Sequence, residues 1–212
     1  MFTRSAQAQT EPLRSIETVA VRLEGSAPRW RRRGRVRWRA AVALVLRESP
    51  RGIEMLVIRR AVRAGDRWSG DAALPGGKVD ADDASIESTA MRETLEEVGL
   101  DLDTVGARRL GTLSDHPPAS QGRWANFAVT PVVFAIEGDP PLRLHPDEVA
   151  EARWVALEAL RPVQSRMLWW WRPYKRVPLG VPFVLSRWRL EGLTIWGLTY
   201  GIIDEFLTRL GR

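Results

Sequence analysis

Two kinds of apolar periodicity alternate along the chain of 212 residues. Residues 37–46 and 53–60 are apolar, β-rich runs, and the polar residues 48–52 between them predict a hairpin. Residues 127–136 are almost continuously apolar, which predicts a strand in the interior of the sheet. Between residues 80 and 99, apolar side chains instead recur at the 3.6-residue spacing of a helix.

The segment from residue 80 to residue 99 predicts one amphipathic helix of about four turns. Its start coincides with an acidic cluster, in which Asp83 can accept hydrogen bonds from free backbone N–H groups of the first turn. Gly99 suits the left-handed residue that closes a helix. The buried side of the helix is expected to consist of Ile86, Ala90, Met91, Leu95 and Val98.

The rest of the chain adds short strands and a closing helix. Strands are predicted at residues 107–114, 148–155, 181–190 and 193–196, and helices at residues 156–160 and 198–210. Alternating strands with few helices favour the α/β class, arranged as an α/β/α sandwich around a mixed sheet.

The first 35 residues begin with polar side chains and are interrupted at residues 25–28, so we expect an extension outside the catalytic domain of residues 36–212. The net charge of +6 is concentrated in arginines between residues 29 and 39. Such a basic arm can bind nucleic acid or an anionic membrane surface, or it can simply be solvated. We expect no nucleic-acid partner, whereas peripheral membrane contact stays open.

The amino-acid composition limits which side chains can bind a metal ion or form disulfides. The chain has no cysteine and two histidines, His116 and His145, so disulfides, thiolate sites and histidine-based zinc sites are excluded. Any metal must then bind carboxylates. No stretch approaches the roughly 20 apolar residues of a membrane-spanning helix, and we expect a cytoplasmic protein.

Three carboxylates share one face of the predicted helix. Glu93, Glu96 and Glu97 stand at positions i, i+3 and i+4, where like charges repel one another. The face is either a solvated acidic patch or a site for hard divalent cations such as Mg2+ and Mn2+, which prefer oxygen ligands. The neighbouring Gly76 and Gly77 favour the cation site, because glycines let the backbone approach a ligand closely.

These residues resemble the Nudix box, the signature of enzymes that hydrolyse a nucleoside diphosphate linked to another group. From Arg92 to Gly99 the chain matches the signature at every fixed position. It departs from the signature further upstream, because Asp83 stands where the family has a glutamate and Arg92 comes one residue late. The matching residues are Gly77, Arg92, Glu93, Glu96, Glu97 and Gly99.

A second resemblance covers more of the chain. Residues 56–61, Gly70 and residues 74–80 are similar to the coenzyme A diphosphatase branch of the Nudix superfamily, and residues 195–199 look like the C-terminal end of that branch. Two departures are a segment from residue 60 to residue 70 that is about one residue long and Trp68 in the place of a histidine. The likeness to the Nudix fold covers about residues 36–210.

The resemblance implies a set of site residues. Glu93, Glu96 and Glu97 would hold Mg2+ or Mn2+, with the Gly77 carbonyl as a further ligand. Glu93 or Glu148 would take the proton from the attacking water, and Arg92 would brace a neighbouring glutamate. Substrate binding is assigned to Arg60, Gly76, Gly77 and Lys78.

Three functions follow as alternatives. The first is hydrolysis of coenzyme A or acyl-coenzyme A to adenosine 3′,5′-bisphosphate and a phosphopantetheine. The second is hydrolysis of another nucleotide, such as a nucleotide sugar, a dinucleoside polyphosphate or a damaged nucleotide. The third is a non-catalytic Nudix-like module that binds nucleic acid through the basic arm, which the complete carboxylate trio argues against.

Residues 169–171 are three consecutive tryptophans. Because side chains alternate between the two faces of a strand, all three cannot point into one core. A wall or lid over the substrate, a homodimer interface and a membrane-interface anchor are the alternatives for this segment.

Overall fold

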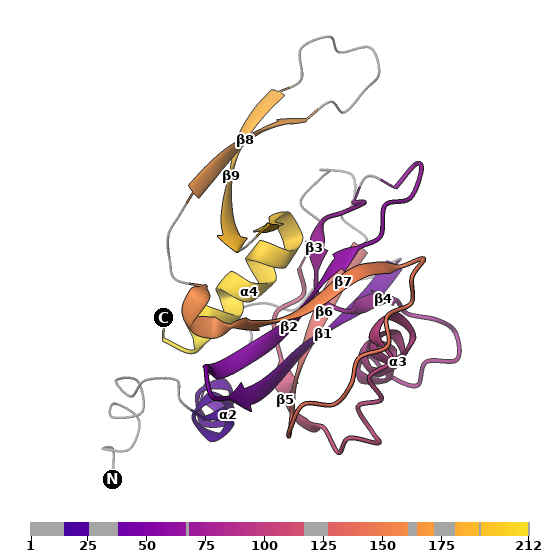
Figure 1. Ribbon diagram of the computed structural model, residues 1–212, viewed down its shortest axis with the longest axis vertical. Helices are drawn as coiled ribbons and strands as arrows, with labels where there is room; N and C mark the ends of the chain where they lie inside the picture. Colours follow the sequence, from indigo (N-terminus) through magenta and orange to yellow (C-terminus); the bar gives the residue numbers. More distant parts are fainter. Residues whose placement is uncertain are drawn as a thin grey trace.

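The computed structural model describes residues 15–25, 38–66, 68–116, 127–160, 165–171, 181–190 and 192–211, with the backbone alone for residues 165–171 and 181–186. Its centre is a mixed sheet of seven strands (Figure 1). The strands are β1 (Trp38–Ser49), β2 (Gly52–Arg60), β3 (Ala72–Ala73), β4 (Gly76–Lys78), β5 (Arg108–Thr112), β6 (Phe127–Ile136) and β7 (Val149–Ala156).

The order of the main strands is β3-β2-β1-β6-β5, with β4 paired to β1 and β7 paired to β2. β1 and β6 run parallel over their whole shared length, from Trp38 opposite Phe127 to Arg47 opposite Ile136. The other pairs are antiparallel. β6 therefore lies inside the sheet between β1 and β5, as its continuous apolar sequence predicts.

The hairpin of β1 and β2 opens like a fork. The two strands pair near the turn, from Leu46 opposite Met55 to Ser49 opposite Gly52. Further from the turn, β4 pairs with β1 and β3 pairs with β2, so the short segment from β3 to β4 bridges the opening. Residues 74–77 are thereby fixed between the two long strands, where the Ala43 N–H donates to the Pro75 carbonyl at 2.8 Å.

Helices cover both faces of the sheet (Figure 1). Helix α3 (Ile86–Val98) packs on one face, and helices α2 (Ile16–Glu24) and α4 (Gly197–Arg209) pack on the other. Successive residues of β1 alternate between the two cores, with Leu44 facing α4 and Val45 facing α3. The predicted α/β class and layering around a mixed sheet are confirmed.

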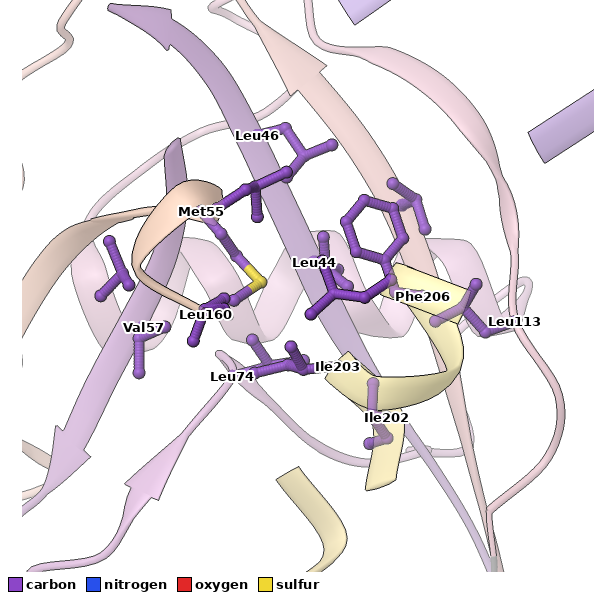
Figure 2. Close-up of a cluster of buried hydrophobic side chains, with 14 of the residues drawn as sticks. Leu44, Leu46, Met55, Val57, Leu74, Leu113, Leu160, Ile202, Ile203 and Phe206 are labelled. Atoms are coloured by element: carbon purple, nitrogen blue, oxygen red, sulfur yellow. The ribbon is translucent and has the colours of Figure 1, made fainter. Parts of the chain in front are cut away.

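The larger core joins the sheet to α4. Figure 2 shows Phe206 and Ile203 of α4 against Leu44 and Met55 of the central strands. All four side chains are buried. Burial of such side chains contributes about 1.5–3 kcal/mol each, so this contact fixes α4 on the sheet.

The N-terminal segment differs from the expected extension outside the catalytic fold. Helix α2 buries Val19, Ala20 and Leu23 in the same core as α4. Arg22 of α2 donates to the Leu210 carbonyl at 2.5 Å, and Arg209 of α4 donates to the Leu23 carbonyl at 3.1 Å. Residues 16–24 are thus part of the domain, whereas the arginines from residue 29 to residue 37 fall in a stretch that the structure does not describe.

Helix α3 corrects two local predictions. Ser85, not Asp83, caps its first turn, because Ser85 and Ser88 form a reciprocal capping box. Leu95 was expected on the buried side and is instead 46% exposed. Gly99 closes the helix in the left-handed conformation with φ of 65°, as predicted.

The C-terminal part contains a second sheet of three antiparallel strands. β8 (Ser165–Trp171), β9 (Val181–Leu190) and β10 (Leu193–Trp196) precede α4, which confirms the predicted strands at 181–190 and 193–196. The predicted helix at 156–160 is a single 3-10 turn, η1 (Leu157–Ala159). The side chains of Trp169–Trp171 are outside the described part of the structure, and no helix within that part could span a membrane.

Candidate active site

Gly76 and Gly77 form a bend, called the glycine bend below, and each of them is in close contact with a different neighbour. Gly76 has φ of 154° and pairs with Val42, and a Cβ atom at this position would overlap the backbone of Ala41 and Val42. A Cβ atom at Gly77 would overlap the carboxylate of Glu93. Gly76 is therefore required by the sheet, whereas Gly77 makes room for a side chain of α3.

Arg92 connects the bend to the helix. Its guanidinium binds both carboxylate oxygens of Asp83 at 3.0 Å, Glu93 at 2.9 Å, Glu96 at 3.0 Å and the Lys78 carbonyl at 3.1 Å. These partners raise the pKa of Arg92, with the hydrogen bond to Asp83 as the largest cause. Arg92 thus has the geometry of a brace for the acidic side chains around it.

Asp83 has a defined structural place that the sequence did not indicate. Its carboxylate is buried and also accepts hydrogen bonds from Thr89 Oγ1 at 2.8 Å and from the Asp80 N–H at 2.9 Å. Arg92 is the main cause of a pKa well below the ordinary value for this carboxyl group. The residue that stands in place of the family glutamate holds the brace rather than the helix terminus.

Glu97 is the most deeply buried carboxylate of the trio. It is 4% exposed, and the Gly76 N–H donates to its Oε2 at 3.0 Å. The pKa of Glu97 is raised to about 7, with burial as the largest cause and the negative charges of Glu93 and Glu148 as smaller ones. The Gly76 N–H and the positive charge of Arg60 oppose this shift.

Glu93 lies beside Glu97 in a half-buried position. Burial raises the pKa of Glu93, the contact with Arg92 lowers it, and the charges of Glu96 and Glu148 raise it. The structure therefore brings Glu148 into electrostatic contact with both helix carboxylates, although it lies 51 residues further along than Glu97. Glu148 is also paired with Arg63 at 3.2 Å, a residue that the sequence did not single out.

The donor set fits a divalent cation in its chemistry. Buried carboxylates with raised pKa values and mutual repulsion are stabilised when a cation neutralises them. Within the described residues, no three acidic or histidine side chains already form a metal-binding group. The reason is visible in the contacts, because Arg92 draws Glu93 and Glu96 toward its own guanidinium while Glu97 turns to Gly76.

The remaining predicted residues occupy two positions. Arg60 ends β2 and pairs with Asp66 at 2.9 Å, and its charge acts on Glu97. The Lys78 ammonium lies over the ring of Trp38, 4.0 Å from its centroid. The charge of Arg60 thus reaches the buried glutamate, whereas the side chain of Lys78 is engaged by an aromatic ring at the start of β1.

Comparison with known proteins identifies the family. The NUDIX domain model matches residues 36–177, which is more than half of the chain. The chain belongs to the NUDIX domain family. Membership confirms the predicted superfamily and enzyme class, a Nudix hydrolase, and Nudix hydrolases generally need divalent metal ions.

Several Nudix relatives are uncharacterized. Nudix hydrolase NudL of Cronobacter sakazakii is 35% identical over 161 residues, covering 74% of this chain and 76% of the relative. An uncharacterized protein of Schizosaccharomyces pombe is 42% identical over 107 residues, but the match spans 50% of this chain and 32% of that protein. A solved MutT/nudix family protein of Enterococcus faecalis has 18% identity and a TM-score of 0.49, with 99% of this chain and 75% of that chain covered.

Proposed function

We propose that this Nudix protein hydrolyses the diphosphate linkage of coenzyme A or acyl-coenzyme A with Mg2+ or Mn2+. The products would be adenosine 3′,5′-bisphosphate and a phosphopantetheine. The observation that carries the hydrolytic part is the buried Glu97 carboxylate, which lies in electrostatic contact with Glu93 and Glu148 beside the glycine bend. A solvated acidic patch would not bury a carboxylate against a backbone N–H group.

The substrate branch is supported by where the resembling segments lie. Residues 56–61 lie on β2 beside the opening of the hairpin, residues 74–80 include the segment that bridges it, and residues 195–199 contact β3 next to that segment. The Trp196 indole N–H donates to Asp71 at 3.0 Å, and Thr199 Oγ1 donates to the Ala72 carbonyl at 3.1 Å. Segments more than a hundred residues apart in the sequence therefore meet beside the same edge strand.

Each site residue then has a role in the reaction. Glu93, Glu96 and Glu97 would hold the divalent ions, with the Gly77 carbonyl as a further oxygen ligand. The chemistry that these ions supply when bound is neutralisation of phosphate oxygens and acidification of the attacking water. Glu148 or Glu93 accepts the water proton, and Arg92 keeps Glu93 in position through its hydrogen bond of 2.9 Å.

Substrate contacts fall to groups at the ends of β2 and β4. Arg60 supplies positive charge close to Glu97 and would bind a phosphate of the substrate there. Gly76 and Gly77 allow the diphosphate to approach the backbone. Lys78 adds a second positive charge once its ammonium leaves the Trp38 ring.

A substrate panel with product analysis by mass spectrometry tests the proposal. The panel contains coenzyme A, acetyl-coenzyme A, ADP-ribose, a nucleotide sugar and a dinucleoside polyphosphate, each with Mg2+ or Mn2+. Coenzyme A should give adenosine 3′,5′-bisphosphate and the phosphopantetheine at the highest kcat/KM, and chelation should abolish the reaction. Preferred cleavage of another nucleotide would refute the coenzyme A assignment and leave the Nudix chemistry intact.

Glu97→Gln tests the role of the buried carboxylate. Removing its charge should lower kcat at least about a hundredfold at saturating Mg2+, since a metal-bound carboxylate is lost while the shape of the side chain is kept. Circular dichroism and thermal unfolding should show an intact fold. Equal rates for Glu97→Gln and the parent protein would contradict the assignment.

A further inference from the structure

Two tryptophans from distant parts of the chain meet at the edge of the sheet. Trp68 lies in the loop that follows β2, and Trp196 ends β10 at the start of α4. Their ring centroids are 6.1 Å apart, with 43° between the ring planes. Trp68 is 40% exposed, so part of its ring is open to a ligand from the solvent.

The inner ring of the pair is fixed. The Trp196 indole N–H donates to Asp71 Oδ1 at 3.0 Å, immediately before β3. The first turn of α4 is held to the same strand by the hydrogen bond from Thr199 to the Ala72 carbonyl. Trp196 is therefore held in a fixed position, and the ring of Trp68 packs against it.

The outer ring is tied to the arginine of the site through one carboxylate. Asp66 Oδ1 accepts a hydrogen bond from the Trp68 backbone N–H at 2.9 Å, and Asp66 Oδ2 accepts one from Arg60 Nη2 at 2.9 Å. The loop is closed on the strand by the Gly70 N–H, which donates to the Arg60 carbonyl at 3.1 Å. Asp66 thus sets the position of Trp68 relative to Arg60.

Arg60 in turn reaches the catalytic carboxylates. Its positive charge lowers the pKa of both Glu97 and Asp71, so the guanidinium lies close enough to act on both carboxylates. Among the described residues its Nε is buried with no hydrogen-bond partner, and its side chain is one-third exposed. Printed contacts therefore connect the aromatic pair to Asp66 and Arg60, and the charge of Arg60 reaches Glu97.

We propose that the Trp68–Trp196 pair is the stacking surface for the nucleobase of the substrate, with Arg60 binding the phosphate next to it. This inference rests on the proposed function and assigns the end of the substrate that the Nudix carboxylates do not touch. A flat base gains from stacking on an exposed indole, and an arginine suits the adjacent phosphate. A nucleotide carries its base and its diphosphate on opposite sides of the ribose, and Arg60 is linked to Trp68 through Asp66 and to Glu97 through its charge.

Another exposed tryptophan is less suited to this task. Trp38 is also 40% exposed, but the ammonium of Lys78 lies over its ring at 4.0 Å. A base stacking there would have to displace a cation from the ring face. The Trp38 ring is therefore already occupied by Lys78, whereas the described residues around Trp68 place no cation over its ring.

Calorimetric binding of ADP and of inorganic pyrophosphate to the full chain, both with Mg2+, separates base from phosphate. Trp68→Ala should weaken ADP binding about tenfold and leave pyrophosphate binding unchanged, because pyrophosphate has no base. Trp68→Phe should retain most of the ADP affinity. Val62→Ala, in the same loop and at a side chain that is 84% exposed, should bind both ligands as the parent does.

Three results would overturn the inference: no binding of ADP by the parent protein, unchanged ADP affinity in Trp68→Ala, or equal weakening of ADP and pyrophosphate in that variant. The steady-state readout separates this inference from the proposed function. If Trp68→Ala hydrolysed coenzyme A with an unchanged KM, the stacking surface would be refuted and the proposed reaction would still stand. If Trp68→Ala selectively lost ADP binding but the parent protein hydrolysed no diphosphate, the stacking surface would be supported and the proposed reaction refuted.

Discussion

At the scale of single residues, the candidate site depends on how the guanidinium of Arg92 is shared among the neighbouring carboxylates. Arg92 binds two carboxylates of the trio, and Asp83 binds Arg92 through both of its oxygens. The Asp83 side chain is only 6% exposed, so its ion pair with Arg92 is better shielded from water than a pair on the open surface. The position of Glu93 is therefore set by a carboxylate ten residues before it.

Asp83→Asn should release this arrangement. Loss of the Asp83 charge weakens two charge-assisted hydrogen bonds to Arg92, which is itself 27% exposed, so we expect the unfolding free energy to fall by about 1–2 kcal/mol. kcat should fall about tenfold as Glu93 loses its fixed position. Urea unfolding and steady-state kinetics measure both effects.

Asp80→Asn is the control for Asp83→Asn. Asp80 lies 3.7 Å from the same guanidinium, but its side chain is largely exposed. Its loss should change stability by less than about 0.5 kcal/mol and leave kcat unaltered. Equal effects of the two substitutions would show that Asp83 has no special part in holding Arg92.

At the scale of elements, α4 is held by a buried polar network as well as by its apolar side. Glu205 accepts hydrogen bonds from the Ser114 N–H at 3.0 Å and from Ser114 Oγ at 2.7 Å, and it contacts His116 Nε2 at 2.7 Å. Burial, the largest single influence, raises the pKa of Glu205, but the bonds from His116 and Ser114 together lower it to about 2. The ionised carboxylate therefore fastens α4 to the chain after β5.

Glu205→Gln should destabilise the protein in a pH-dependent way. Because the pKa of Glu205 is lower in the folded state, its contribution is complete above the unfolded pKa of about 4.5 and is lost as pH falls toward 2. The stability difference between parent and variant should be largest near neutral pH and narrow below about pH 4.5. Urea unfolding from pH 3 to pH 7 measures it.

The neighbouring Asp204 on the exposed side of α4 provides the comparison for Glu205. Asp204→Asn should leave both the stability and its pH profile close to those of the parent. A constant stability difference for Glu205→Gln across the whole range would show that packing, not ionisation, holds the helix.

At the scale of the whole molecule, the first and last helices stabilise each other. Leu23 of α2 is buried in the core that α4 completes, and main-chain carbonyls of each helix accept hydrogen bonds from an arginine of the other. Leu23→Ala should lower the unfolding free energy by about 2–5 kcal/mol, because it leaves a cavity in the core.

Val21→Ala is the paired substitution for Leu23→Ala, since Val21 lies on the same helix and is 52% exposed. It should cost less than about 0.5 kcal/mol. Neither variant should change KM at a temperature where both are folded, because α2 packs on the face of the sheet opposite α3. Thermal unfolding that is identical in both variants would mean that α2 adds nothing to the core.

Most of the fold could be predicted from periodicity, because Leu44 and Val45 or Val132 and Val133 alternate as strand residues between two buried faces. Gly99 could also be predicted as a helix end, because a glycine after the last apolar position of a helix is a local sequence signal. Short-range patterns do not reveal tertiary partners, so the burial of Leu23, the exposure of Leu95 and the contact between Asp83 and Arg92 were missed.

In the candidate site, too, local patterns could be predicted from the sequence and tertiary contacts could not. Glu93, Glu96 and Glu97 could be selected from their spacing on a single helix. The link from Arg60 through Asp66 to Trp68 could not, because it depends on how the loop after β2 folds back on its own strand. A tryptophan in an irregular loop gives no periodic signal by which its neighbour Trp196 could be recognised.

The forked hairpin has a practical consequence for engineering. Its two strands join at the turn of Pro50 and Arg51, whereas the glycine bend occupies the other, open end. An epitope tag or fluorophore inserted between Pro50 and Arg51 would therefore sit remote from the reacting groups. The tip of the hairpin is a natural attachment point for following this protein without impairing its turnover.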